Sequence, residues 1–236
     1  MIRYVEETGS TNADLAQRLN DGERVAEGDW LVTDRQTAGR GRQGRNWSDG
    51  AGNFMGSTVV RISPADPPTP TLALLTGLAL HELVSAIIPR PDALRLKWPN
   101  DLLFHGAKLS GILLERVEDV VVIGIGVNLA HSPKLADRPT IALSFDVPTP
   151  DRNHFAEQLA AQFALELERW RNFGLGPILR RWTAAATPVG TAMKVHEPDG
   201  SLVEGQFTGL GEDGSLSLRL ADGSLRAIHA GDVSLV

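Results

Sequence analysis

The segment GRGRQGR could bind a negatively charged ligand. Three arginines, Arg40, Arg42 and Arg45, alternate in it with glycines. Guanidinium groups bind carboxylates and phosphates in a bidentate manner, and glycine lets the backbone approach a ligand closely. The segment therefore predicts an anion-binding loop. It lacks both the following helix of a dinucleotide fingerprint and the Lys-Ser/Thr ending of a P-loop, so a solvated basic loop is the open alternative.

Further charged side chains lie in the segment KWPNDLLFHGAKLSGILLE. Lys97 and Asp101 flank a proline turn, and Lys108 lies at the start of an apolar strand. A cation at the edge of a dry surface stabilises an anion strongly, which makes Lys108 a candidate for charge stabilisation. The alternatives are an ordinary strand-edge lysine and a turn-forming aspartate.

Two glycines, Gly124 and Gly126, interrupt the otherwise apolar run VVIGIGVNL. Something is expected to pack against the backbone there, and a ligand, a neighbouring helix and a bulge are all compatible with the pattern. None of the six histidines has metal-ligand spacing with another, so we expect no metal site built from protein side chains.

These residues need a scaffold, and the hydrophobic pattern predicts its elements. Ser10 and Thr11 precede a helical pattern that ends at Gly22, so the STN triplet is expected at a helix amino terminus. We also expect a loop over 34–52, a buried helix over 72–88 and a turn at 99–101. Five strands are expected, the last two forming a hairpin: 30–33, 54–62, 94–98, 112–117 and 120–129.

The carboxyl-terminal half contains a helix and then a change of composition. A helix from residue 149 places five large apolar residues on one core stripe: Phe155, Leu159, Phe163, Leu167 and Trp170. From about 189, short alternating runs are separated by turns, among them three Asp-Gly-Ser sequences, which predicts a small β-barrel. At about 150 residues per domain, 236 residues fit one large domain over 1–186 and a small one over 187–236.

Charge and composition exclude several function classes. With 23 basic and 29 acidic residues the net charge is −6, which disfavours nucleic-acid binding and attraction to an anionic membrane. There is no cysteine, and the amino terminus lacks the apolar region of a signal peptide. A cytoplasmic protein without a membrane partner is expected.

Taken together, five motifs in order resemble those of the biotin protein ligases: STN at 10–12, QTAGRGRQGRNW from 36, KWPND from 97, KLSGILLE from 108 and GIGVN from 124. The resemblance is strong over 7–129, and the glycine-rich tail is similar to the small barrel that ends the bacterial members. It implies an α/β (α+β) fold with a mixed, mostly antiparallel sheet and helices. The catalytic domain would be class II synthetase-like, with a small C-terminal SH3-like β-barrel.

The resemblance also implies the activity. The chain would use ATP, with Mg²⁺ on its phosphates, to activate biotin as biotinyl-5′-AMP and transfer it to a lysine of a biotin carboxyl carrier domain. The implied catalytic residues are Lys108, Arg42, Arg40 and Asp101. Biotin would be bound by Ser10, Thr11, Asn12, Gln36, Arg40, Gly41, Arg42, Lys108, Gly111, Leu113, Gly124 and Gly126. ATP would be bound by Arg40, Arg42, Arg45, Trp47, Lys97, Asn100 and Asn128.

Two rival functions remain. A lipoate or other acyl-carrier ligase would share the fold, but it lacks the pairing of GRGRQGR with KWPND. A non-catalytic carrier-binding module would not need cations at a point of charge transfer. Some family members carry an amino-terminal helix-turn-helix module, for which a first motif at residue 10 leaves no room, so no DNA-binding repressor is expected. Homodimers occur in the family through sheet edges, and a homodimer is therefore an expectation here.

Overall fold

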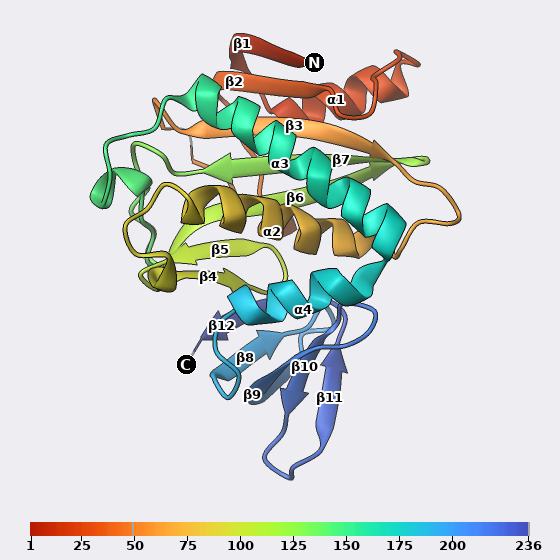
Figure 1. The fold of residues 1–236 in the computed structure, drawn as a ribbon, viewed down its shortest axis with the longest axis vertical. Coiled ribbons are helices and arrows are strands. Elements are labelled where there is room, and N and C mark those ends of the chain that lie inside the picture. The colour runs from red at the N-terminus through yellow and green to blue at the C-terminus, as the bar shows by residue number, and fades with distance from the viewer. Residues whose placement is uncertain (49, 236) are drawn as a thin grey trace.

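A computed structural model describes residues 1–48 and 50–235 as two β-sheets with four α-helices (Figure 1). The larger sheet has seven strands in the order β1-β2-β3-β7-β6-β5-β4, and the smaller has five in the order β11-β10-β9-β8-β12. The helices are α1 (Thr11–Asn20), α2 (Leu72–Ser85), α3 (Arg152–Phe173) and α4 (Leu175–Ala185). The strands are β1 (Ile2–Thr8), β2 (Trp30–Gln36), β3 (Phe54–Arg61), β4 (Leu94–Lys97), β5 (Asp101–Phe104), β6 (Ala107–Val117), β7 (Val120–Val127), β8 (Ala192–His196), β9 (Leu202–Leu210), β10 (Leu216–Arg219), β11 (Leu225–Ile228) and β12 (Asp232–Leu235).

The larger sheet is mixed and mostly antiparallel, as expected. Strand β1 runs parallel to β2, and every other neighbouring pair in this sheet is antiparallel. Strands β6 and β7 form the expected hairpin, with Val117 opposite Val120 across the two-residue turn. This pairing sets the candidate residues of β6 beside the two glycines of β7.

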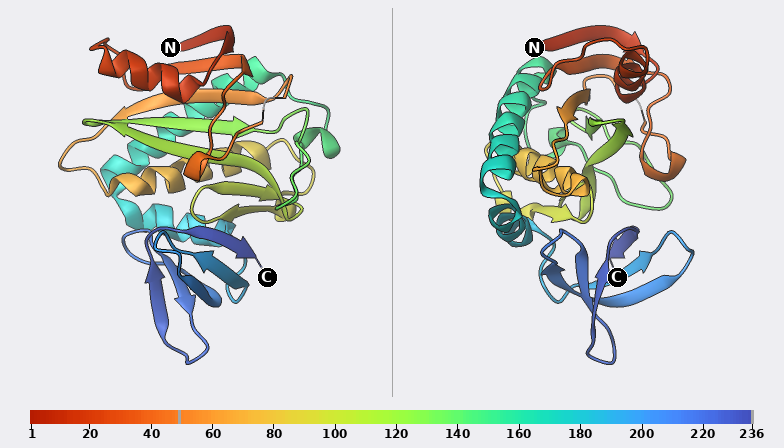
Figure 2. Two further views of the ribbon diagram at one scale, coloured as in Figure 1. Left: turned by 180° about the vertical axis from the view of Figure 1, so that it is seen from behind. Right: turned by 90° about the vertical axis from the view of Figure 1, so that its right-hand side faces the viewer.

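Helices cover the two faces of this sheet differently (Figure 2). On one face α2 and α3 pack against alternate strand residues such as Val121 and Ile123. On the other face Leu15 of α1 packs against Val120 and Val122 of β7. Helix α1 covers only the part of that face near the amino terminus, so the remainder is left for the arginine loop and a pocket.

The predicted helices have the expected local determinants. Ser10 caps α1, because its Oγ accepts a hydrogen bond from the Ala13 amide at 3.5 Å. The five stripe residues of α3 are all buried, which confirms that the stripe belongs to the core. Helix α2 is buried along most of its length, as its composition indicates. In the described part of the chain, no helix is long and apolar enough to cross a bilayer.

The structure contains three elements that the pattern did not predict. Strand β1 is a partly exposed edge strand whose charged residues hide its alternation. Strand β5 begins at Asp101, which was expected to be part of a turn. Helix α4 begins one residue after Gly174 and contains a glycine and a proline in its first turn, which obscure its periodicity. Strand β6 also begins earlier than expected, so that Lys108 is its second residue.

The five C-terminal strands form one antiparallel sheet, in agreement with a small β domain. Each Asp-Gly-Ser sequence is a turn in which the aspartate carboxylate accepts from the serine amide two residues later, at 2.9 Å or 3.0 Å. Trp98 joins the two sheets, since its Nε1 donates to the Gly214 carbonyl at 3.1 Å. The domain boundary expected at 186/187 lies between α4 and β8 and stays a prediction.

Candidate active site

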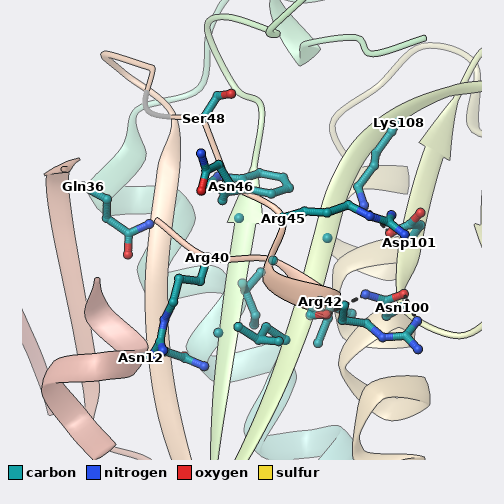
Figure 3. A pocket seen from close by; sticks show the side chains of 18 of the residues that line it. Asn12, Gln36, Arg40, Arg42, Arg45, Asn46, Ser48, Asn100, Asp101 and Lys108 are labelled. Carbon is teal, nitrogen blue, oxygen red and sulfur yellow. Dashed lines mark hydrogen bonds and ion pairs between the residues drawn. The ribbon is translucent and has the colours of Figure 1, made fainter. Parts of the chain in front are cut away.

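A cavity of about 540 Å³ lies on the α1 side of the large sheet. Its floor is formed by β6 and β7, one end by the start of α1, and its cover by the arginine loop around residues 40–48. All the candidate biotin and ATP residues line this cavity except Lys97. Asn12 and Arg40 lie at one end, and Asp101, Asn100, Arg42 and Lys108 lie at the other (Figure 3).

The end of the cavity near α1 is lined by uncharged polar groups. Gln36 Oε1 accepts from the Thr11 amide at 2.9 Å and lies 3.2 Å from the Thr11 hydroxyl oxygen. Thr11 Oγ1 lies 2.7 Å from Ser57 Oγ, which in turn donates to Asn12 Oδ1 at 2.6 Å. All four side chains are buried, so their mutual hydrogen bonds hold them in place. Hydroxyl and amide groups of this kind suit a neutral ligand that carries both N–H and carbonyl groups.

Protein side chains pack against the two glycines of β7. A methyl group at Gly124 would lie 2.4 Å from Asn12 Oδ1, and one at Gly126 would lie 2.2 Å from the Trp47 ring. The structure thus answers the question that the sequence left open, because the start of a helix and the arginine loop make these close approaches. Trp47 Nε1 is buried and has no hydrogen-bond partner among the described residues, so a donor is available at this point of the cavity.

Gly126→Ala is expected to push Trp47 away from β7 and to raise the KM for ATP by about tenfold, if this indole belongs to the nucleotide site. Steady-state kinetics at varied ATP measures the effect. Gly9→Ala is the matched control, since nothing lies within 4 Å of the position of its added methyl group. An unchanged KM for ATP in the Gly126 variant would contradict the placement of Trp47.

At the other end of the cavity, a buried carboxylate is held between two lysines. Lys108 Nζ lies 2.5 Å from Asp101 Oδ1, and Lys97 Nζ lies 3.3 Å from Asp101 Oδ2. Burial alone would raise the pKa of the Asp101 carboxyl, but the charges of Lys108 and Lys97 outweigh it and hold this pKa below its usual value. Burial lowers the pKa of the Lys108 ammonium, although the Asp101 charge opposes this effect. The cluster has an excess of positive charge, which suits a site that receives anions.

The three arginines of the loop point to different partners. Arg40 pairs with Glu115 at 3.2 Å, while Arg42 donates to Asn100 Oδ1 at 3.1 Å and to the Gly231 carbonyl at 3.2 Å. Arg45 forms an ion pair with Asp232. Burial lowers the pKa of the Arg42 guanidinium, and the charges of Asp101 and Asp232 oppose this shift. Two of the three arginines therefore join the loop to the C-terminal sheet.

Two candidate residues have structural partners that bear on their roles. Lys97 does not line the cavity, and its Nζ donates to the Val233 carbonyl at 2.9 Å as well as contacting Asp101. Asn128 Nδ2 donates to the backbone carbonyls of Ile141 at 3.1 Å and Lys108 at 3.4 Å. Asn128 therefore ties the segment after β7 to β6 while it lines the cavity.

Sequence reasoning missed several residues of the site. Glu115 and Ser57 lie in strands beside predicted residues, and Asp232 comes from the C-terminal sheet. A cavity wall is also formed by the segment after β7, through Pro133, Leu135, Asp137, Arg138 and Thr140. The final glutamate of KLSGILLE was a signal for Glu115, because a charge interrupts an apolar strand there. Ser57, Asp232 and the wall segment after β7 have no comparable signal in the sequence.

Comparisons with known proteins agree with this site. The model of the Biotin/lipoate A/B protein ligase family matches residues 5–128, and that of the Biotin protein ligase C terminal domain matches 192–236. A biotin–acetyl-CoA-carboxylase ligase of Mycobacterium tuberculosis is 37% identical over 98% of this chain and 88% of its own length. One of Paracoccus denitrificans is 33% identical over 90% and 91%. A solved biotin protein ligase from Aquifex aeolicus in complex with biotin and ATP superposes with a TM-score of 0.87 at 26% identity, covering 100% of this chain and 98% of that one.

The fold and the site thus define a protein ligase of the biotin/lipoate class. Within this class the two domain matches and the full-length relatives are specific: the chain belongs to the biotin protein ligases.

Proposed function

We propose that the chain is an ATP-dependent ligase that converts biotin to biotinyl-5′-AMP and transfers the biotinyl group to a lysine of a biotin carboxyl carrier domain. The main support is one cavity that joins a polar, uncharged end to a cluster of Asp101 with two lysines under an arginine loop. Such a cavity can hold a neutral ring at one end and an anionic reaction centre at the other.

In the first step a carboxylate oxygen of biotin attacks the α-phosphorus of ATP. A bond from this oxygen to the α-phosphorus forms as the bond from the α-phosphorus to pyrophosphate breaks, so two anions must approach each other. Lys108 and Arg42 supply positive charge at this end of the cavity before the bond forms, which is where preorganised charge lowers a barrier most. We propose that Arg40 contributes after leaving Glu115.

Mg²⁺ would be carried by the ATP phosphates. Among the described residues no group of three histidine, aspartate or glutamate side chains could hold a metal ion. Asp101 is already paired with lysines and Asp232 with Arg45, so these carboxylates are engaged. Mg²⁺ commonly binds through substrate phosphates rather than in a protein cage, and the donor set fits that arrangement. The ion would there neutralise phosphate charge.

In the second step the acceptor lysine, uncharged, attacks the acyl carbon. The amide bond forms as the bond to AMP breaks, and the proton of the amine leaves with the AMP phosphate or water. We expected Asp101 to orient this amine and to accept its proton. Its lowered pKa makes it a weak base, and its two oxygens already contact Lys108 and Lys97. These features favour the orienting role over proton transfer.

The decisive experiment supplies biotin, MgATP and a carboxylase carrier domain, and then weighs the carrier by mass spectrometry. A gain of one biotinyl group, dependent on both substrates, is expected. Lipoate in place of biotin gives the control, and a lipoyl gain without a biotinyl gain would favour the rival acyl-carrier ligase.

The rate of pyrophosphate release is expected to fall at alkaline pH earlier than the ordinary lysine pKa of 10.5 would allow. Burial lowers the pKa of Lys108, so its charge is lost as pH rises through that lowered value. Asp101 does not contribute to this limb, because Lys108 and Lys97 hold the pKa of its carboxyl below the usual value. In Lys108→Arg this alkaline limb should move upward, since guanidinium does not titrate there. If the rate falls at the same pH in the wild type and in Lys108→Arg, a group other than Lys108 causes the fall.

We also propose a homodimer through a sheet edge and a cytoplasmic location. Strand β1 has β2 as its one strand neighbour in the described part of the chain, so its outer edge is open to pairing. The absence of cysteine suits a reducing compartment. Light scattering with and without biotin and MgATP tests the dimer.

A further inference from the structure

We infer that Glu115 is a positioning residue that fixes the direction of the hydrogen bonds at the polar end of the cavity, and thereby the selection of ligands with N–H groups. The inference rests on the proposed function. Glu115 lies in β6, and its half-buried carboxylate faces two site residues. Oε2 accepts from Asn12 Nδ2 at 2.7 Å, and Arg40 Nη2 lies 3.2 Å from Oε1.

The charge of Glu115 determines the orientation of the Asn12 amide. An ionised carboxylate can only accept hydrogen bonds, so the amide must turn its NH₂ group toward Glu115. Asn12 Oδ1 then faces Ser57, whose hydroxyl lies 2.6 Å away. The single hydroxyl hydrogen of Ser57 is thus committed to Asn12.

The direction of the Ser57 hydrogen bond also determines the direction of the Thr11 hydrogen bond. Because Ser57 has no second hydrogen, it must accept in its 2.7 Å contact with Thr11 Oγ1. The other neighbour of the Thr11 hydroxyl, Gln36 Oε1, is also an acceptor. The hydrogens of both hydroxyl groups therefore point into the network, and their oxygens keep lone pairs for a ligand in the cavity that they line.

The resulting site accepts N–H groups and offers one of its own. The Asn12 amide keeps a second N–H beyond the one used on Glu115. A ureido ring has two N–H groups and one carbonyl, which complement this set. A dithiolane ring has no N–H group and would leave buried acceptors unpaired, a mismatch that discriminates strongly between ligands.

Arg40 is the second partner of the same carboxylate. Figure 3 shows Arg40 beside Asn12, at the end of the cavity away from Lys108. Glu115 thus links the polar end of the site to the loop that covers it.

The test is Glu115→Gln, which keeps the shape but adds a donor, so that Asn12 can face it with either end of its amide. The KM for biotin is expected to rise by about tenfold or more while kcat changes less than about twofold, because the ring is bound alike in ground and transition states. Calorimetric titration of biotin without ATP should show the same loss. Glu115→Asp, which restores an acceptor-only group, should recover part of it.

Glu204→Gln is the matched control, since it removes an exposed carboxylate that pairs with Lys194 at 2.8 Å on the C-terminal sheet. In an Asn12→Ala background, Glu115→Gln should reduce the affinity for biotin little further, because the series of hydrogen bonds from Glu115 through Asn12 to Ser57 is already interrupted. If Glu115→Gln does not fold, Ser57→Ala interrupts the same series of hydrogen bonds and should raise the KM for biotin in the same way.

Wild-type affinity for biotin in the folded Glu115→Gln protein, or in Ser57→Ala if that variant replaces it, would overturn the inference. The proposed function has a separate test, because it fails if the wild-type chain makes no biotinyl-AMP or adds no biotinyl group to the carrier domain. An active wild type with an unaffected Glu115→Gln variant would leave the function standing and remove the positioning role.

Discussion

Lys108→Ala is expected to lower the rate of biotinyl-AMP synthesis by about 10²- to 10³-fold, the usual effect of removing one preorganised charge from a reaction centre. Lys108 Nζ is the cation closest to Asp101, at the end of the cavity where Arg42 also lies. The variant should lose kcat and kcat/KM together, since the charge acts mainly when the two anions approach. Pyrophosphate release with saturating biotin and MgATP measures the loss.

The fold should tolerate this change. Lys108 lines the cavity and is not part of the hydrophobic core, and Lys97 Nζ stays 3.3 Å from Asp101, so the buried carboxylate keeps one cation. Lys194→Ala is the matched control, because it removes a lysine that is paired with Glu204 far from the cavity. A Lys108→Ala protein with wild-type pyrophosphate release would remove Lys108 from the reaction centre.

The sequence predicted those parts of the site that local pattern encodes. The cap Ser10, the α3 stripe and the β6–β7 hairpin each depend on residues within a few positions of one another, and the structure contains all three. The five ordered motifs added the chain positions of the remaining candidates. All of these except Lys97 line a single cavity.

What the sequence could not predict is which distant residues meet. Asn12 and Glu115 are 103 positions apart, and Arg45 and Asp232 are 187 apart. The first contact depends on how α1 packs on β6, and the second on where the C-terminal sheet docks. Neither arrangement follows from propensity or periodicity, because both are set by packing of whole elements.

The arginine loop gives a further example. Its composition predicted anion binding, but Arg40 has Glu115 as a partner and Arg45 has Asp232. A run of alternating arginine and glycine contains no information on these carboxylates. The loop's role as a cover therefore depends on a sheet that begins almost 150 residues later in the chain.

Arg42→Ala is expected to slow biotinyl-AMP synthesis and to release the intermediate faster, each by about tenfold or more, as the loss of a charge-assisted hydrogen bond would allow. Arg42 is one of the joints between the loop and the rest of the protein, because it donates to Asn100 at 3.1 Å and to the Gly231 carbonyl at 3.2 Å. Strand β12 follows this glycine directly, and its first residue, Asp232, holds Arg45. Loss of Arg42 leaves the loop tied to the C-terminal sheet through Arg45 alone among these arginines.

Two measurements separate the roles of Arg42 in charge and in closure. Filtration of the protein after one turnover reports retention of biotinyl-AMP, and a protease that cleaves after arginine reports access to the loop at Arg40 and Arg45. We expect biotin with MgATP to protect the wild-type loop and to protect the variant less. Arg180→Ala, at an exposed position of α4, is the control. Slower synthesis with full retention of biotinyl-AMP would show that Arg42 contributes its charge only and has no part in closure. The loop would then close and shield the adenylate from water without the contact between Arg42 and Gly231.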